Sequence, residues 1–261
     1  MKIQLPDKFD LTRPEHYILI VEVHPGQFSF FLYNPEDDFS YFYQRIPESE
    51  QPDAFVHFQN VFFDNEFFAL PFKKVYLINY TPIFTYVPTP LFKEEDKKEY
   101  LKFHFIGHPG KILCQNLQKP AVSILHGMPE EIYDFFHRSF VDIQIMHHTA
   151  PLIRYFRNKI QLENWNRLII NRQGKYLDIL CFSRSDFLLG NHFVCQQPAD
   201  ALSYILFVWQ QMQFDQLKDF IYIMGDKADL LRQLQVYIQN IIPVDLTTGI
   251  PFEITALTLC E

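Results

Sequence analysis

Glycine is scarce in this chain, and its scarcity excludes one common kind of site. Only 8 of the 261 residues are glycine, and no two of them are adjacent or separated by a single residue. Loops that cradle phosphate depend on glycine, because a residue without a side chain lets backbone N–H groups approach the ligand closely. The sequence therefore has no glycine-rich phosphate loop.

Cysteine is also sparse, and its spacing gives no sign of a metal site. Cys114, Cys181, Cys195 and Cys260 lie far apart and form no CxxC pair. Structural zinc sites and disulfide frameworks need paired spacing. We therefore expect buried thiols in a reducing cytoplasm and no bound metal.

A basic excess and long apolar runs are missing as well. The formal net charge is −8, whereas lysine and arginine contacts with phosphate supply most non-specific affinity for nucleic acids. Uninterrupted apolar runs are short, as at 204–209, and residues 1–7 contain no apolar segment. We therefore expect a cytoplasmic protein with no nucleic-acid partner, no signal peptide and no membrane span.

What the chain has instead is aromatic side chains, arranged in a regular order of elements. Phenylalanine occurs 28 times and tyrosine 14 times, which predicts bulky cores. The first half alternates apolar runs with turns rich in proline, glycine and aspartate. It predicts strands at 17–23, 28–33 and 39–45, a helix from Asp53, a strand at 74–80, a helix at 129–140 and a strand at 141–146.

The second half repeats this order. It predicts strands at 167–171, 175–182 and 186–195, a helix at 198–212, a strand at 220–224, a helix from Lys227 and a last strand at 252–259. The helix from Lys227 has one apolar stripe, made of Leu230, Leu234, Tyr237 and Ile241. With a linking helix at 150–160, the pattern predicts two βββαβα domains, 1–160 and 161–261.

The first half also carries an insertion at about 82–127. It predicts a strand at 84–87, a charged helix at 92–103 and strands at 111–117 and 121–125. One side of that helix presents Phe92, Tyr100 and Phe103. These side chains either pack on the strands of the insertion itself or bind a protein partner.

Two histidine motifs are weak candidates for chemistry. His147 and His148 are adjacent, so on a strand they face opposite sides and cannot share a metal. His192 and Cys195 are three residues apart on a strand, which also directs them to opposite faces and disfavours a Cys–His dyad. The sequence predicts no catalytic residue.

The duplicated order of elements resembles the actin-like ATPase fold, in which two ribonuclease H-like halves are joined by a helix. The insertion is similar to the strand–helix–strand–strand module of the cell-division protein FtsA and the pilus-assembly protein PilM. The length and the Phe- and Tyr-rich composition also resemble an uncharacterised family of Bacteroidetes proteins with this fold. The resemblance implies an α/β fold with a nucleotide cleft between the halves.

The loops that would meet a nucleotide depart from the family pattern. Glu22 stands where the first hairpin carries aspartate, and Pro25 beside it has no N–H to donate. Asn171 replaces the second aspartate, and Asp226 follows the single glycine where paired glycines are expected. The resemblance therefore implies a vestigial nucleotide site at Glu22, Gly26, Asn171, Gly174, Gly225 and Asp226.

These departures favour a non-catalytic binding or scaffolding protein with an unknown protein partner. The alternative is a divergent ATPase or phosphotransferase that binds Mg-ATP. A third and weaker alternative is nucleic-acid binding through local lysine and arginine side chains.

Overall fold

The computed structural model describes residues 2–47, 53–103, 105, 107, 110–160, 164–184, 186–244 and 252–258. The chain forms two compact units. The first comprises Met1–Asn116 and Ser123–His148, and the second comprises Leu117–Val122 and Thr149–Glu261. The sequence predicts two domains, 1–160 and 161–261, from the repeated order of strands and helices. This boundary stays a prediction.

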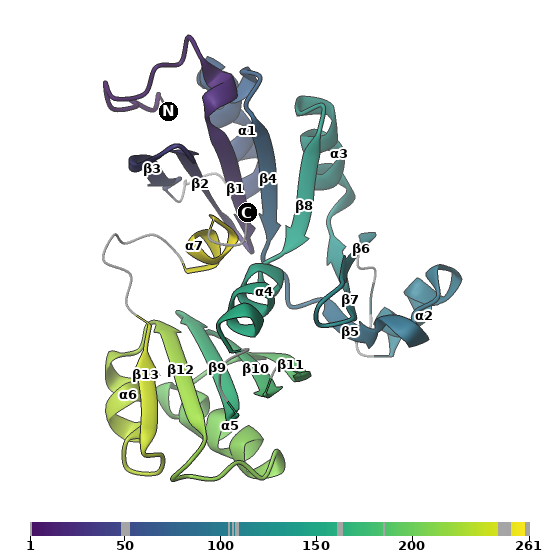
Figure 1. Cartoon of the computed structure of the whole chain (residues 1–261). Coiled ribbons are helices and arrows are strands. Elements are labelled where there is room, and N and C mark those ends of the chain that lie inside the picture. The colour runs from purple at the N-terminus through teal and green to yellow at the C-terminus, as the bar shows by residue number, and fades with distance from the viewer. Residues whose placement is uncertain are drawn as a thin grey trace. The chain divides into compact units, whose positions relative to one another are not determined.

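The first unit is built on a five-stranded sheet (Figure 1). Its strands are β1 (Ile18–His24), β2 (Gln27–Asn34), β3 (Asp37–Arg45), β4 (Lys74–Asn79) and β8 (Ile143–His147), in the order β3-β2-β1-β4-β8. Strands β1, β2 and β3 pair antiparallel, whereas β4 pairs parallel with both β1 and β8. The central strand β1 is buried along nearly its whole length, as expected for a strand covered on both faces.

Phenylalanine fills the core of this unit, between the sheet and the helices α1 (Ala54–Asp64) and α3 (Glu130–Ser139). The Asp53 side chain caps α1 by accepting hydrogen bonds from the amides of Phe55 and Val56, which satisfies two N–H groups that have no partner inside the helix. Phe58 is fully buried, and its ring centroid lies 4.5 Å from that of Phe28. Short 3-10 helices occur at Pro14–His16 and Glu66–Ala69.

The insertion forms a small three-stranded sheet with its own core. Its strands are β5 (Phe84–Pro88), β6 (Lys111–Leu117) and β7 (Val122–Met128), in the order β5-β7-β6. The predicted helix at 92–103 is shorter in the structure: 3-10 turns at Thr89–Leu91 and Glu94–Asp96 precede α2 (Lys97–Lys102). Val87, Leu101 and Leu125 are the buried centre of this insertion module.

The second unit repeats the sheet of the first. Its strands are β9 (Asn166–Gln173), β10 (Tyr176–Ser183), β11 (Asp186–Val194), β12 (Phe220–Gly225) and β13 (Asn240–Pro243), in the order β11-β10-β9-β12-β13. Strands β9, β10 and β11 pair antiparallel, and β12 pairs parallel with β9 and β13. The sequence of neighbours and their directions are therefore the same as in the first unit.

The described part of this unit contains the helices α4 (Thr149–Ile160), α5 (Pro198–Gln211), α6 (Ala228–Leu234) and α7 (Phe252–Thr258). Helix α5 begins with a capping box. The Gln197 side chain accepts a hydrogen bond from the backbone N–H of Asp200, and the Asp200 side chain accepts one from the backbone N–H of Gln197. Among the described residues, no helix has both the length and the apolar character needed to cross a bilayer.

Two predictions about the second unit are wrong. The helix from Lys227 ends at Leu234, and Ile241 lies in β13, because pairing with β12 outweighs the helical spacing of the stripe. The tail is the helix α7 and not a strand. Its Phe252 packs against Tyr155 and Phe156 of α4, with ring centroids 5.0 and 5.7 Å apart, so tertiary packing overrides the alternating pattern.

Candidate functional site

The turn between β1 and β2 is the first place where the resemblance implies contact with phosphate. The turn contains Pro25 and Gly26, and Gly26 has a φ of +79°. An added Cβ at Gly26 would meet no atom within 4 Å. Glycine is therefore favoured at this position by the left-handed backbone conformation and not by a close contact with neighbouring atoms.

Glu22 lies on β1 just before this turn, and its carboxylate is fully buried. It accepts hydrogen bonds from the hydroxyls of Ser29, Tyr43 (3.4 Å) and Tyr80 (3.3 Å). Burial, and secondarily the Glu22 charge, raise the pKa of Tyr43 above its ordinary value. The carboxylate that stands at the position of the family's first aspartate is thus engaged by hydroxyl groups of the same unit.

A cavity of about 980 Å³ opens in the first unit beside the β1–β2 turn. It is lined by the ends of β1 and β4 and by the first turns of α1 and α3. Among the described residues, the charged side chains in its lining are Asp53, Glu130 and Glu131, without lysine or arginine. A phosphate in this cavity would meet carboxylates without a compensating cationic side chain, which is electrostatically unfavourable.

The matching hairpin of the second unit is closed by an internal carboxylate. Asp226 follows β12, and its Oδ2 accepts a 2.7 Å hydrogen bond from the backbone N–H of Gly174, in the β9–β10 turn. The Asp226 N–H in turn donates to the Arg172 carbonyl at 2.8 Å. In this unit, the turn amide that would hold a phosphate oxygen holds an aspartate oxygen.

Gly225 permits this closure. It has a φ of +74°, and a Cβ there would overlap the carbonyl of Arg172. Asn171, the other predicted residue of this half, is buried on β9 opposite Asp178 and Met224. The structure thus brings Gly174, Gly225 and Asp226 together, while Glu22 and Gly26 lie in the first unit.

Sequence reasoning missed a stack of rings at the ends of β1, β4 and β8 in the first unit. The ring of His24 lies 3.7 Å from that of Tyr80, which lies 4.6 Å from that of His148, with centroids as reference points. His147 and His148 are 4.2 Å apart. The prediction that these two rings face opposite sides is wrong, because β8 ends at His147 and His148 follows outside the strand.

His126, on β7, is buried next to this stack. The Asn79 side-chain amide donates to His126 Nδ1 at 2.9 Å and also bonds to the Gly127 carbonyl. Burial, with a smaller contribution from the nearby His148, lowers the pKa of His126 to about 3. His126 is therefore neutral near pH 7 and accepts the hydrogen bond from Asn79 as a polar group of the core.

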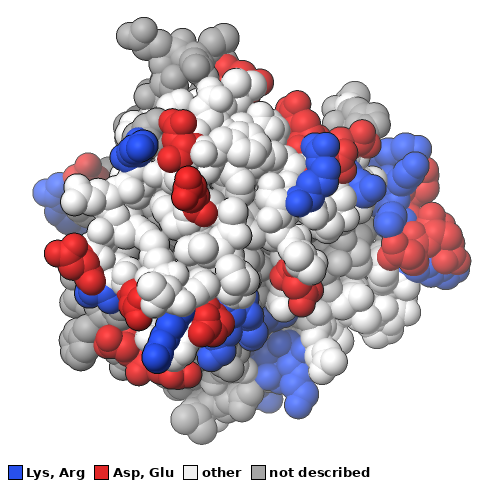
Figure 2. Space-filling view, turned by 90° about the horizontal axis from the view of Figure 1, so that it is seen from above, with Lys and Arg blue, Asp and Glu red and all other residues white. Residues whose placement is uncertain are grey.

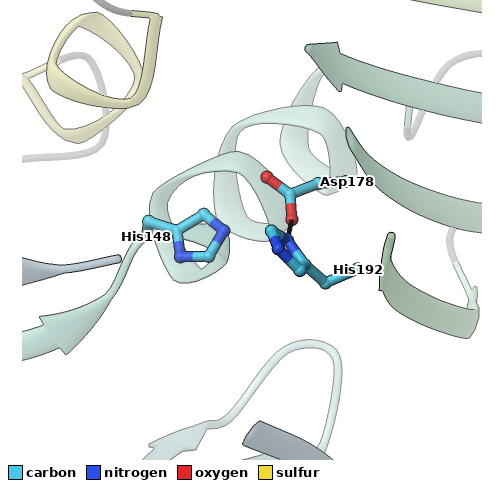
Figure 3. Close-up of side chains that lie close together, drawn as sticks. All are labelled: His148, Asp178 and His192. Carbon is cyan, nitrogen blue, oxygen red and sulfur yellow. Dashed lines mark hydrogen bonds and ion pairs between the residues drawn. The ribbon is translucent and has the colours of Figure 1, made fainter. Parts of the chain in front are cut away.

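His192 pairs with Asp178 and not with Cys195. The two residues face each other across β10 and β11, and His192 Nδ1 lies 2.7 Å from Asp178 Oδ1 (Figure 3). Cys195 is buried, and burial raises the pKa of its thiol above the ordinary value. A thiol with a raised pKa is a poor nucleophile, so this arrangement offers no Cys–His chemistry.

The structure separates the three aromatic residues predicted to bind a partner. Phe92 and Tyr100 are half-buried and pack on the core of the insertion module, with the Tyr100 hydroxyl donating to the Leu91 carbonyl at 2.8 Å. Phe103 is 90% exposed. The α2 helix therefore leaves Phe103 available to a partner, while the other two stabilise the module.

Comparison with known proteins supports the fold and leaves the activity open. A family described as "Protein of unknown function (DUF3822)" matches residues 6–241. No protein of curated function matches the chain.

Two solved structures extend the comparison. The crystal structure of a Bacteroides thetaiotaomicron VPI-5482 protein, with an actin-like ATPase fold and unknown function, has 27% identity and a TM-score of 0.86, covering 97% of this chain and 99% of its own. The PilM–PilN type IV pilus biogenesis complex has 10% identity and a TM-score of 0.52, covering 93% and 97%. The actin-like ATPase fold and the similarity to PilM, both predicted from the sequence, are confirmed.

Proposed function

Since this chain belongs to the DUF3822 family of proteins of unknown function, we propose that it is a non-catalytic binding or scaffolding protein on an actin-like ATPase frame. Its nucleotide loops are degenerate, and its insertion module holds a protein partner. We place it in the cytoplasm, in keeping with the free thiols of Cys114, Cys181 and Cys195.

The observation that carries this proposal is the hydrogen bond from the Gly174 amide to Asp226. A phosphate site built from a hairpin turn needs that amide free and needs no negative charge beside it. The Asp226 carboxylate occupies the Gly174 N–H donor and places a negative charge beside it. The first unit supports the same conclusion, because Glu22 is engaged by three hydroxyls and the adjacent cavity has an acidic lining.

A role in protein binding is supported by the surface of the insertion module. Phe103 and Leu91 are large apolar side chains that are mostly exposed there. PilM, which has a related fold, is seen in a complex with PilN. By analogy with that complex, we propose that the present chain also binds a protein.

A thermal-shift titration of the full chain with Mg-ATP separates this proposal from the alternative of a divergent ATPase. We expect no change in Tm at millimolar nucleotide. A nucleotide present at a hundredfold over its Kd would stabilise the fold by about 2.7 kcal/mol. A saturable rise in Tm, together with release of phosphate, would support the ATPase instead.

Partner binding is tested by retention of proteins from the native source on the immobilised chain. We expect Phe103→Ser to reduce retention of a specific partner strongly, because truncating an exposed aromatic anchor removes a dominant contact. Phe63→Ser is the matched control, since Phe63 is 71% exposed on α1, outside the module. Equal retention by the wild type and both variants would count against a binding role for the module.

A further inference from the structure

A second cavity, of about 600 Å³, lies in the first unit along α2. Apolar side chains from α2, β6 and the neighbouring loops form part of its wall, among them Leu101 and Ile112. The charged side chains in its lining are mostly basic, whereas those of the cavity beside the β1–β2 turn are acidic. Among the residues that the structure describes, four lysines, Lys97, Lys98, Lys102 and Lys111, and one carboxylate, that of Glu130, line it.

The spacing of residues on α2 explains why lysine gathers around an apolar wall. Leu101 is almost fully buried and anchors the helix to the module. Lys97 lies one turn before Leu101, and Lys98 and Lys102 are likewise one turn apart, so these side chains lie on adjacent rows of the helix. The anchoring of Leu101 therefore directs the lysines to the edge of the cavity.

The four lysines differ in how firmly they are engaged. Lys97 pairs with Glu94, and Lys102 pairs with Glu99 at 2.8 Å. The Lys111 ammonium lies 5.0 Å from the ring centroid of Tyr133. The Lys98 side chain is exposed and has no hydrogen bond or ion pair with any residue that the structure describes.

Figure 2 shows the charge pattern around this region. At the right of the view, where Figure 1 draws α2, lysine or arginine and acidic side chains gather side by side, while much of the remaining face is uncharged. This mixing agrees with the i,i+3 pairs on the helix. The face in this view therefore carries mixed charge around α2, whereas lysine outnumbers acid in the lining of the cavity.

We infer that this lysine-rimmed cavity binds an acidic segment of a partner protein, which inserts an apolar side chain against the half-buried Phe105 and Ile112. Flanking carboxylates of the segment pair with Lys98 and Lys111. The inference rests on the proposed function, since it specifies the chemistry of the partner that the module holds.

Charge and shape together favour this occupant over other anions. The chain as a whole carries −8 and therefore repels acidic partners, except where lysine outnumbers acid. A nucleic-acid backbone needs an extended row of cations, whereas the lysines here rim a single cavity. An acidic segment with one apolar side chain uses both features of the cavity.

The test measures fluorescence anisotropy of a labelled peptide against the full chain. The probe is a short peptide in which Leu-Phe is flanked on both sides by Asp and Glu. The comparison probes carry Lys in place of the acidic residues, or Ser in place of Leu-Phe, and a labelled oligouridylate represents nucleic acid. We expect saturable binding of the acidic apolar peptide that weakens as salt rises.

The decisive variant is the double substitution Lys98→Glu and Lys111→Glu, which should weaken binding of this peptide by roughly tenfold or more, or about 1.4 kcal/mol. Lys175→Glu is the matched control, because the Lys175 ammonium also lies over a tyrosine ring, that of Tyr176, at 5.3 Å, but in the second unit. The control should bind as the wild type does. Circular dichroism of both variants verifies that the fold is kept.

Three results would overturn the inference: no binding of the acidic peptide at about 1 mM, equal binding by the double variant, or tighter binding of the oligouridylate. These results are separable from failure of the proposed function. If a cellular partner is still retained in a Phe103-dependent manner while the acidic peptide does not bind, the function stands and the assignment of this cavity is wrong.

Discussion

Gly225 occupies a backbone conformation and a space that few other residues could share. Its φ of +74° lies in the left-handed region, and a Cβ would overlap the Arg172 carbonyl. That carbonyl also accepts the hydrogen bond from the Asp226 amide. The contact between the two loops of the second unit therefore depends on this one glycine.

We expect Gly225→Ala to lower the free energy of unfolding by about 3 kcal/mol, because it combines backbone strain with a steric clash. Urea denaturation of the full chain measures the change. Gly174→Ala is the matched control: Gly174 has a φ of +59° but open space around it, so strain alone should cost about 1 kcal/mol. Equal losses in the two variants would contradict the close approach at Gly225.

Single residues of the candidate site could be predicted from the sequence, but their contacts could not. The resemblance predicts that the Asp226 carboxylate repels a nucleotide, because it stands where paired glycines are expected. The bond between Asp226 and Gly174 joins residues 52 positions apart, and only the pairing of β9 with β12 brings them together. The ring stack around Tyr80 was missed for the same reason.

At the scale of elements, α7 is the clearest case in which packing decides the structure. Phe252 is buried and contacts Tyr155 and Phe156 of α4. The segment alternates apolar and polar residues, a pattern typical of a strand. A seven-residue helix has little intrinsic stability, so α7 forms because α4 offers it an apolar surface.

Phe252→Ala should therefore destabilise the second unit by roughly 3 kcal/mol, as expected for removing a buried phenylalanine side chain. Chemical denaturation followed by circular dichroism measures the loss. Phe207→Ala serves as control, because Phe207 is mostly exposed on α5 and its removal should change stability by about 0.5 kcal/mol or less. A loss at Phe252 no larger than that at Phe207 would mean that α7 does not depend on α4.

Elements with strong local signals were predicted within a few residues of their observed bounds. The capping aspartate of α1 and the turn residues between strands are signals of this kind. The charged helix of the insertion was overestimated, because a 3-10 turn replaces its beginning. The prediction that the apolar stripe of the helix from Lys227 continues to Ile241 is wrong, because Ile241 lies in β13, which pairs in parallel with β12.

At the scale of the whole molecule, the duplication is visible in the order and direction of the strands and not in the identity of the residues. Both sheets have the same order of neighbours and the same strand directions. The order of predicted strands and helices was enough to indicate the actin-like ATPase fold, which the comparison with the Bacteroides structure confirms. Function did not follow from that order, because activity resides in loops that differ between proteins of one fold.

The carboxylate of Asp226 also has a consequence for competition. A group tethered to the same chain competes at an effective concentration in the millimolar range or above, set by the short connection that holds it. A free phosphate that binds the Gly174 amide would have to displace the Asp226 carboxylate, which is covalently part of the same chain. On our proposal that this hairpin is a degenerate phosphate site, the Asp226 carboxylate is an internal competitor for anions, and a single substitution at Asp226 would remove it.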